Sequence, residues 1–337
     1  MAEPLVDPHG RTVRDLRISI TDRCNLRCRY CMPAEGLAWL PRPDLLTYEE
    51  IERVARVCVE RFGFTGIRIT GGEPTVRAHL PVLVDKLARL RPASGAGGGG
   101  TDLSLTTNGA TLRLLAGDLR AAGLRRINIS LDSLRPETFF AITRRHGLDQ
   151  VLDGIDAAVE AGFSPVKVNC VLIRGVNDDE IVDFARFGRE RGVTMRFIEF
   201  MPLDAEEGWT PGTVVPGAEV VETISAVYPL APIPVRGSAP AERFRYVDGA
   251  GEIGVIASVT QSFCGSCDRV RLTAEGMFRN CLFAVKETDL RAILRSGGSD
   301  DDVAAAIAAD VGTKWAGHSI GQVTFIRPDR SMSQIGG

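Results

Sequence analysis

Residues 16–31, LRISITDRCNLRCRYC, contain the pattern that decides the fold of this chain. Residues 16–21 alternate between apolar and polar side chains, which is typical of a β-strand with two different faces. Directly after this strand come Cys24, Cys28 and Cys31, in the spacing C-x₃-C-x₂-C. The sequence therefore predicts a strand whose carboxyl end carries a loop with three thiols.

Similar β-rich runs recur between residues 15 and 201, each before a longer stretch that has a helical pattern. Thr47 and Glu50 form a capping-box pattern that places a helix start between the first two runs. Strands that alternate with helices predict βαβ crossovers and a parallel sheet or barrel. The predicted strands are Leu16–Thr21, Gly66–Thr70, Asp102–Thr107, Arg126–Ser133, Val166–Ile173 and Thr194–Met201.

The two faces of these strands differ in chemistry. Along each strand, every second residue is apolar, and we expect these residues to face the helices. The residues between them are polar; we refer to the two sets as the apolar and the polar parity. Because a closed eight-stranded barrel is filled by packed side chains, the polar parity predicts a cavity for a polar ligand instead. A one-residue slip would turn a strand over, so the alternative is that some of these residues are solvated strand ends. The polar positions are Arg17, Ser19, Thr21, Arg68, Thr70, Ser104, Thr106, Asn108, Asn128, Ser130, Asp132, Lys167, Asn169 and Arg196.

The composition is that of an ordinary globular protein. Of 337 residues, 44% are hydrophobic and 25% are charged, and the formal net charge is −3. This charge gives no general attraction to nucleic acid or to an anionic membrane, so an anionic ligand would need a local cluster of arginines. No apolar run is long enough to span a bilayer and the first residues lack a signal-peptide pattern, so we expect a cytoplasmic protein.

The alternation of strands and helices stops after Met201, where Pro- and Gly-rich segments begin. We therefore expect two domains, residues 1–205 and residues 206–337. The glycine-rich stretch within residues 91–101 is interpreted as a surface loop without function, inserted between a helix and the third strand.

The eight cysteines are better explained as metal ligands than as disulfides in a reducing compartment. Cys24, Cys28 and Cys31 suit three corners of a [4Fe–4S] cube, which leaves one iron open to a reacting ligand. A structural metal site is the alternative. Cys58 and Cys170 lie among apolar neighbours and are predicted to be small buried hydrophobes.

A second cysteine group lies near the other end of the chain. Cys264 and Cys267 are followed after thirteen residues by Cys281. This group suits an auxiliary cluster with one open iron, but it also suits a zinc site completed by a distant residue such as His318.

The first triplet resembles the signature of the radical S-adenosylmethionine (SAM) superfamily, C-x₃-C-x-aromatic-C, with Tyr30 in the aromatic position. Gly71-Gly72-Glu73-Pro74, at the end of the second strand, resembles the motif with which that superfamily holds the amino group of SAM. Together the two motifs imply a [4Fe–4S] cluster on the first triplet, with SAM bound beside it.

Further motifs narrow the resemblance to the GTP 3′,8-cyclase family of molybdenum cofactor biosynthesis, from Arg11 to Gly337. They are GRTVRDLRISITDRCNLRCRYCMP, RITGGEP, LTTNG, LRRINISLD, RFIEFMP, QSFCGSCDRVRL and the closing Ile-Gly-Gly. The resemblance implies an α/β fold, an incomplete six-stranded (βα) barrel closed by a smaller C-terminal domain, which agrees with the strand count above.

The resemblance also implies roles for individual residues. Cys264, Cys267 and Cys281 would hold a second [4Fe–4S] cluster, whose open iron meets the guanine base. The SAM contacts would be Tyr30, Gly72, Glu73, Ser130 and Met201. The GTP contacts would be Arg17, Arg68, Thr106, Lys167, Arg269, Val270 and Arg271, with Arg196 as a weaker candidate. The residues implied in catalysis are Arg17, Arg269, Arg271, Gly336 and Gly337.

The residues themselves support an anion site. Arginine and lysine on the inward parity supply charged partners for a triphosphate, although an ordinary ion pair is the commoner fate of any one of them. By resemblance, a radical made from SAM would remove H3′ of GTP, and the C3′ radical would then add to C8 of guanine. One-electron reduction and protonation of the resulting base radical would give (8S)-3′,8-cyclo-7,8-dihydroguanosine 5′-triphosphate.

The implied partners are a low-potential electron donor and the next enzyme, the cyclic pyranopterin monophosphate synthase that receives the product. No nucleic acid or membrane partner is expected, and a homodimer stays open. Two alternatives are a radical SAM peptide maturase, which usually carries more C-terminal cysteines, and a non-catalytic zinc protein.

Overall fold

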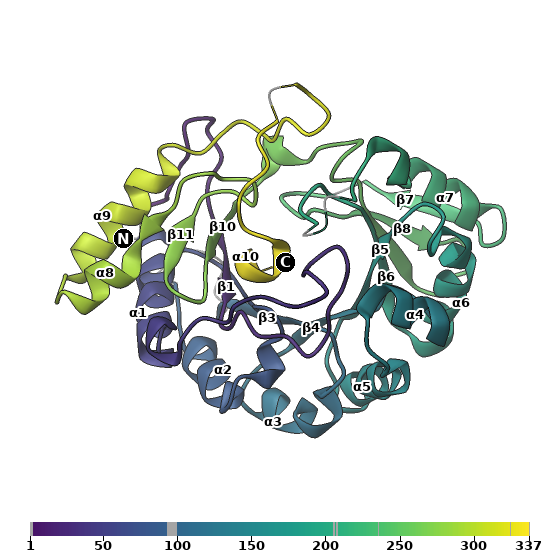
Figure 1. Cartoon of the computed structure of the whole chain (residues 1–337), viewed down its shortest axis with the longest axis horizontal. Helices are drawn as coiled ribbons and strands as arrows, with labels where there is room; N and C mark the ends of the chain where they lie inside the picture. The colour runs from purple at the N-terminus through teal and green to yellow at the C-terminus, as the bar shows by residue number, and fades with distance from the viewer. Residues whose placement is uncertain are drawn as a thin grey trace.

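The computed structural model describes residues 3–92, 100–204, 206, 208–234, 236–323 and 325–336. The predicted glycine-rich surface loop lies largely outside these residues, as does Gly337. A curved sheet forms the centre of the molecule, with helices on its outer side, and α10 (Met332–Ile335) lies inside the curve (Figure 1).

Six parallel strands of this sheet come from the first two hundred residues, as predicted. They are β1 (Asp15–Ser19), β2 (Gly66–Thr70), β3 (Asp102–Thr107), β4 (Arg126–Ser130), β5 (Val166–Leu172) and β6 (Thr194–Glu199). The predicted end of β4, Ser133, was wrong by three residues, since the strand ends at Ser130. Beyond Ser130, the backbone N–H of Val171 on β5 donates to a carboxylate oxygen of Asp132 at 2.8 Å. A side chain there replaces the backbone ladder.

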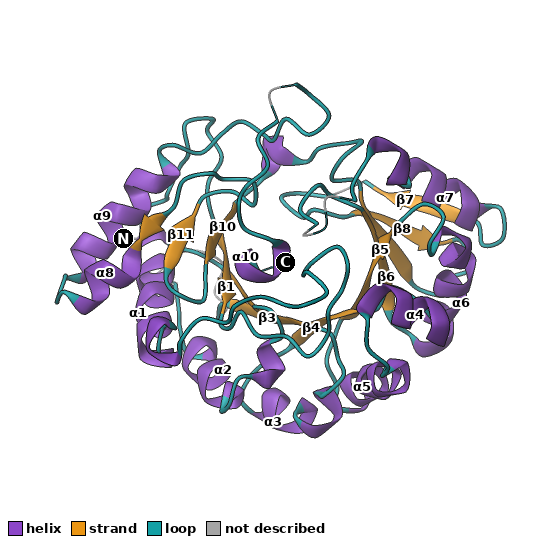
Figure 2. Ribbon diagram, viewed as in Figure 1, coloured by secondary structure: helices purple, strands orange, loops and turns teal. Residues whose placement is uncertain are grey.

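The C-terminal third extends this sheet at both edges. The strand order is β12-β11-β10-β1-β2-β3-β4-β5-β6-β9-β8-β7, so the open sheet begins and ends with C-terminal strands (Figure 2). Both β10 and β9 run parallel to their barrel neighbours. The added strands are β7 (Leu230–Ile233), β8 (Glu242–Tyr246), β9 (Glu252–Ile256), β10 (Arg269–Leu272), β11 (Met277–Arg279) and β12 (Thr288–Asp289).

Helices cover the outer face of the sheet (Figure 2). The first begins at the predicted capping box, in which the Thr47 hydroxyl accepts from the Glu50 N–H and the Glu50 carboxylate accepts from the Thr47 N–H. The helices are α1 (Tyr48–Arg56), α2 (Leu80–Ala88), α3 (Ala116–Ala121), α4 (Pro136–Thr143), α5 (Leu148–Glu160), α6 (Ile181–Arg191), α7 (Gly217–Ser225), α8 (Leu290–Arg295) and α9 (Asp300–Val311).

The core lies between the sheet and these helices, and the predicted apolar parity faces it. Ile18, Ile69 and Leu105 of three neighbouring strands are fully buried there. Cys58 and Cys170 are also fully buried in this core, as predicted. Since the apolar parity is used on the outer side, the polar parity is left to face the inside of the curve.

Candidate active site

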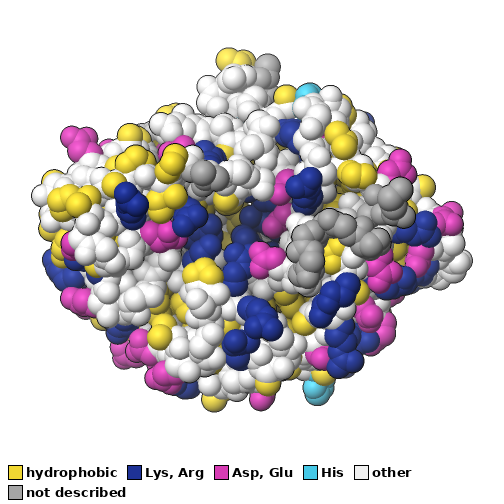
Figure 3. All heavy atoms as spheres, turned by 180° about the vertical axis from the view of Figure 1, so that it is seen from behind, with side chains coloured by type: hydrophobic (Ala, Val, Ile, Leu, Met, Phe, Trp, Pro, Cys, Tyr) yellow, Lys and Arg dark blue, Asp and Glu magenta, His cyan; other side chains and the backbone are white. Residues whose placement is uncertain are grey.

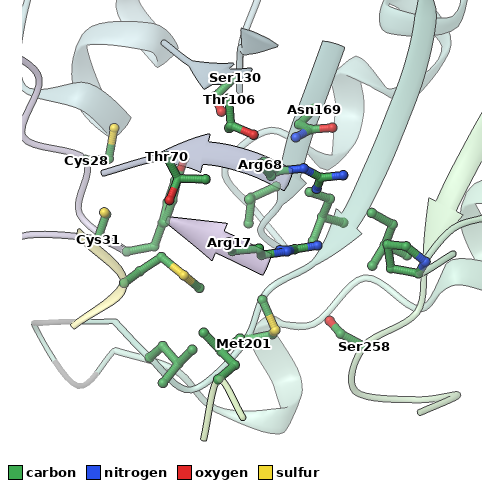
Figure 4. Close-up of a pocket in the computed structure, with 18 of the residues that line it drawn as sticks. Arg17, Cys28, Cys31, Arg68, Thr70, Thr106, Ser130, Asn169, Met201 and Ser258 are labelled. Carbon is green, nitrogen blue, oxygen red and sulfur yellow. The ribbon is translucent and has the colours of Figure 1, made fainter. Parts of the chain in front are cut away.

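A cavity of about 290 Å³ lies inside the curve of the sheet and is lined by both cysteine groups. Side chains of the predicted polar parity form much of its wall, mainly near the carboxyl ends of the barrel strands (Figure 4). Those that line it are Arg17, Arg68, Thr70, Thr106, Asn108, Ser130, Asp132, Asn169 and Arg196. Lys167 is not among the lining residues, although its pKa is affected by the charges of Arg196 and Arg68.

The N-terminal cysteine loop is held at one end of the cavity by its own backbone. The N–H groups of Arg27 and Arg29 donate to the carbonyls of Thr143 and Ile142, at the end of α4, at 2.9 and 3.0 Å. Arg27 also donates back to the carbonyl of Cys24 at 2.6 Å. The three thiols are therefore placed by a loop that is fixed to the barrel.

The GGEP turn lies directly against this loop. A Cβ atom on Gly72 would collide with the carbonyl oxygen of Arg23, so only glycine allows this approach. The Glu73 carboxylate accepts hydrogen bonds from Thr75, Thr107 and the Asn108 N–H, which join the turn to the end of β3. Three of these bonds end on Oε1 and only one on Oε2, so Glu73 shapes the turn and still has acceptor capacity toward the cavity that it lines.

Burial makes the N-terminal thiols hard to ionise in the metal-free protein. Burial raises the pKa of Cys24 to about 11 and that of Cys31 to about 12, and nearby negative charge adds to each rise. Burial also raises the pKa of Cys28, with further contributions from Asp132, Cys31 and Cys24. The thiols contribute to one another's pKa values because they lie near one another. Metal binding requires deprotonated thiols, so a cluster bound there would hold them as thiolates.

The C-terminal thiols lie in a more positive environment. Burial raises the pKa of Cys264, but hydrogen bonds from His318 and Ser262 outweigh it and lower the value to about 6. Burial likewise raises the pKa of Cys267, and the positive charges of Arg269 and Lys314 outweigh that effect.

Burial dominates for the third thiol of this group, so the pKa of Cys281 is raised. All three thiols nevertheless line the same cavity as the N-terminal group.

Three arginines stand side by side on β10, β1 and β2. Arg17 is the register partner of both Arg271 and Arg68. Burial lowers the pKa of Arg17 to about 9 and that of Arg68 to about 10. After burial, the charge of Arg68 lowers the pKa of Arg17 most. The charges of Arg196 and Arg269 lower the pKa of Arg68 further. Burial is the main cause of these depressed values, and repulsion between the positive charges adds to it.

The same cluster contains buried nitrogens that form no hydrogen bond within the described residues. They are Nε of Arg17, which lies 3.7 Å from a carboxylate oxygen of Asp15, and one terminal nitrogen of Arg269. Asp15 lies two residues before Arg17 on β1 and offsets part of this positive charge. The pKa of Asp15 is lowered, because the charges of Arg68, Arg17 and Arg269 outweigh the effect of its burial. Unpaired buried donors are costly, so this geometry favours an anionic ligand.

The two ends of the cavity differ. Figure 4 shows Cys28 and Cys31 on one side, while the side chains of Arg17 and Arg68 extend in parallel toward the other. On the face opposite α10, Lys and Arg side chains gather around a hollow near its centre (Figure 3). The cavity therefore suits a ligand with one end near a thiol group and an anionic end among the arginines.

The C-terminal tail enters this arginine cluster. Nη1 of Arg271 donates a hydrogen bond to the carbonyl of Gly336. Gly336 has φ +81°, and a Cβ there would clash with Oγ1 of Thr70. Val270, between the two arginines of β10, points into the hydrophobic core, so only its backbone can border the site.

Several residues at or beside the cavity were missed by the sequence analysis. Asp15 lies beside the arginine cluster, and it could have been found by extending the alternation of β1 back by one polar position. Phe263, Ser258 and Met332 also contribute to the wall, but they lie on loops and on α10 where no periodicity points to them.

Among the described residues, no group of three or more His, Cys, Asp or Glu side chains converges on one metal ion. The cysteines of an iron–sulfur cube bind different irons at separate corners, so they need not converge on one point. No helix in the described part is long and apolar enough to cross a bilayer.

Comparisons with known proteins agree with this geometry. Residues 18–188 match the radical SAM superfamily, and residues 193–320 match the family Molybdenum Cofactor Synthesis C. The chain is 48% identical over 338 residues to a GTP 3′,8-cyclase of Streptomyces coelicolor, covering 100% of this chain and 97% of that protein. It is 50% identical over 343 residues to a GTP 3′,8-cyclase of Rhodopirellula baltica, covering 100% and 94%.

A solved structure shares the fold. Streptococcus suis SuiB bound to S-adenosylmethionine superposes with a TM-score of 0.56 at 13% identity, over 85% of this chain and 64% of that one. At this identity the likeness concerns the fold alone.

Proposed function

Because the chain belongs to the radical SAM superfamily and, within it, to the GTP 3′,8-cyclase family of molybdenum cofactor biosynthesis, we propose that its cavity holds GTP between two iron–sulfur clusters. The family's reaction joins C3′ of the ribose to C8 of the guanine and gives (8S)-3′,8-cyclo-7,8-dihydroguanosine 5′-triphosphate. The observation that carries the proposal is that two thiol groups and five arginines line one cavity. The full-length relatives favour this function over a peptide maturase or a zinc protein.

At the N-terminal end, Cys24, Cys28 and Cys31 would hold the [4Fe–4S] cluster that the superfamily implies. SAM would lie beside it, against Tyr30, Gly72, Glu73, Ser130 and Met201, all of which line the cavity. The bare backbone at Gly72 leaves room for a ligand on its open side, while Glu73 holds the turn in shape. When bound, the cluster and SAM together supply one-electron chemistry that yields a 5′-deoxyadenosyl radical.

At the other end, arginines would bind the triphosphate. Nε of Arg17 and a terminal nitrogen of Arg269, which form no hydrogen bond within the described residues, offer charged hydrogen bonds. An anion would also offset the burial and the mutual repulsion that lower the pKa values of Arg17 and Arg68. Thr106 lines the wall nearby, and Arg271 connects the site to Gly336. Lys167 and the backbone of Val270 would be further GTP contacts, and Arg196 is a weaker candidate.

We assign a second [4Fe–4S] cluster to Cys264, Cys267 and Cys281. The donor set fits, because three thiols without a fourth protein ligand leave one iron free to meet the guanine. His318 was the alternative fourth ligand of a zinc site; its hydrogen bond to Cys264 is equally suited to a cluster sulfur.

The partners outside the chain follow from the reaction. A low-potential electron donor would reduce the N-terminal cluster, and the next enzyme, a cyclic pyranopterin monophosphate synthase, would receive the product. A homodimer remains a proposal of the same kind.

Iron analysis tests the two-cluster assignment. Anaerobically reconstituted protein should hold roughly eight irons per chain with matching sulfide, since two cubes are expected. Roughly four irons, or zinc bound at the C-terminal cysteines, would contradict the assignment.

An anaerobic assay with GTP, SAM and dithionite tests the function itself. It should yield the cyclised nucleotide together with 5′-deoxyadenosine. Formation of 5′-deoxyadenosine with a peptide substrate but not with GTP would favour the maturase.

A further inference from the structure

Two of the three C-terminal cysteine segments are tied together by a single buried lysine. Nζ of Lys314 donates to the carbonyl of Arg269, two residues after Cys267, at 2.7 Å. It also donates to the carbonyl of Asn280, directly before Cys281. Lys314 is only 3% exposed, so it forms an internal link between two of the three cysteine segments.

The third segment is joined to the same loop by Arg11. Its guanidinium donates to the carbonyl of Cys264 at 2.6 Å and to those of Trp315 and Ala316 at 2.5 and 2.7 Å. Asp7 holds the guanidinium through an ion pair of 2.5 Å. The N-terminal turn and residues 314–316 therefore form one frame around the C-terminal thiols.

The charge of Lys314 acts on the carboxylate of Asp310, but the two groups form no ion pair. In the portion of the chain described by the structure, Lys314 forms no ion pair with Asp or Glu. Burial lowers the pKa of Lys314, negative charge on the sulfurs of Cys267 and Cys281 opposes this, and the charges of Arg11 and Arg269 add to it. Two of its three N–H donors are used by carbonyls, which leaves one donor for a further acceptor.

A buried ammonium without a counter-ion is costly, and neutral carbonyls offset only part of that cost. We propose that Lys314 is a positioning residue of the C-terminal cluster that also supplies the positive charge balancing the negative charge of the cluster. The inference rests on the second cluster assigned above. Lys314 holds the segments of Cys267 and Cys281 at the separation that a cube requires and makes the reduced cluster easier to form.

Replacing Lys314 separates these two roles. Lys314→Met keeps the length of the side chain but removes its charge and donors, whereas Lys314→Arg keeps the charge. Lys86→Met is the matched control, because Lys86 lies on the surface and pairs with Glu52 at 2.9 Å. Each full-length variant is reconstituted anaerobically, and its iron content and the midpoint potentials of both clusters are measured by redox titration with electron paramagnetic resonance.

In Lys314→Met, the midpoint potential of the C-terminal cluster should become more negative, because a nearby positive charge stabilises the more negative reduced state. The N-terminal cluster, recognised by the change of its signal with SAM, should keep its potential, and Lys314→Arg and Lys86→Met should resemble the wild type. Full iron content with an unchanged potential in Lys314→Met would overturn the proposal.

Loss of the cluster is also informative. If Lys314→Met loses the C-terminal cluster while Lys314→Arg keeps it, the charge is required and the proposal stands. If both variants lose it, Lys314 acts through packing alone and the charge role is wrong. A wild-type protein that binds no second cluster would instead contradict the proposed function, whatever the variants do.

Discussion

The hydroxyl of Tyr30 donates a hydrogen bond of 2.6 Å to a carboxylate oxygen of Asp132. The aromatic position of the first cysteine loop is thereby tied to the end of β4, across 102 residues of sequence. The other oxygen of Asp132 accepts the N–H of Val171 at 2.8 Å. One buried carboxylate thus joins the cysteine loop to two neighbouring strands.

Tyr30→Phe should destabilise the metal-free protein by about 1.5–3 kcal/mol, because a buried carboxylate loses a charged hydrogen bond. Tyr48→Phe is the matched control, since its hydroxyl donates to the neutral carbonyl of Ala78 near the surface. Its cost should be smaller, about 0.5–1.5 kcal/mol. Urea unfolding measures both, and equal losses would show that the Tyr30 contact has no special weight.

The two cysteine groups should differ in their effect on SAM cleavage. Cys24→Ser, Cys28→Ser or Cys31→Ser removes a ligand of the cluster that delivers the electron, so 5′-deoxyadenosine should no longer form. Cys281→Ser should still release some 5′-deoxyadenosine while the cyclised product disappears. Cys58→Ala, in the hydrophobic core, should keep both activities. Identical behaviour of the two groups would contradict the division of roles.

Lys167 should make GTP binding dependent on pH. Burial, together with the charges of Arg196, Arg126 and Arg68, lowers its pKa to about 7. A triphosphate favours the charged ammonium and raises that pKa, so binding takes up a proton. The affinity should therefore fall as pH rises through ~7 toward ~8.5.

Calorimetry in buffers with different ionisation enthalpies measures this proton uptake. Lys167→Arg stays charged throughout this range and should take up fewer protons than the wild type. Titration of GTP itself is common to both proteins and cancels in the comparison. Equal uptake would mean that the triphosphate does not reach Lys167.

The hydrogen bond between Arg271 and the carbonyl of Gly336 predicts that a single methyl group added at Gly336 reduces cyclisation. Gly336→Ala places a Cβ against Thr70 at a left-handed backbone position, so it should displace the tail from Arg271. Cyclisation should drop strongly while SAM cleavage and folding remain, and deletion of residues 336–337 should act in the same way. Gly321→Ala is the control, because Gly321 has the same φ of +81° and open space around it. An equal effect in both variants would show that backbone strain alone is responsible.

Much of the barrel could be predicted because its signals are local. The alternation along β1 and β2 places Arg17 and Arg68 on one face, and parallel register then sets them side by side. The cysteine spacing and the capping box at Thr47 are likewise complete within a few residues. Such patterns need no knowledge of distant segments.

The remainder depends on pairings between distant segments. Nothing near Arg271 indicates that β10 pairs with β1, which is what brings Arg271 next to Arg17. The links from Arg11 and Lys314 to the cysteine segments are equally remote in sequence. The helix after Thr47 also changes to a π-helical turn at Val57–Arg61, which a period of 3.6 residues does not predict.

The central claim is that one cavity places the ribose of GTP toward the N-terminal cysteines and its base toward the C-terminal ones. Both groups line that cavity, and only a ligand with two distinct ends can meet both. The radical should then remove hydrogen from the sugar, because the base is held at the other cluster.

The most direct measurement follows deuterium from GTP into 5′-deoxyadenosine by mass spectrometry. GTP labelled at C3′ should transfer its deuterium, whereas GTP labelled at C8 should not, since C8 accepts the new bond. Transfer from C8, or from neither position, would contradict both the orientation of GTP and the assignment of Arg17, Arg68 and Arg271 to its triphosphate.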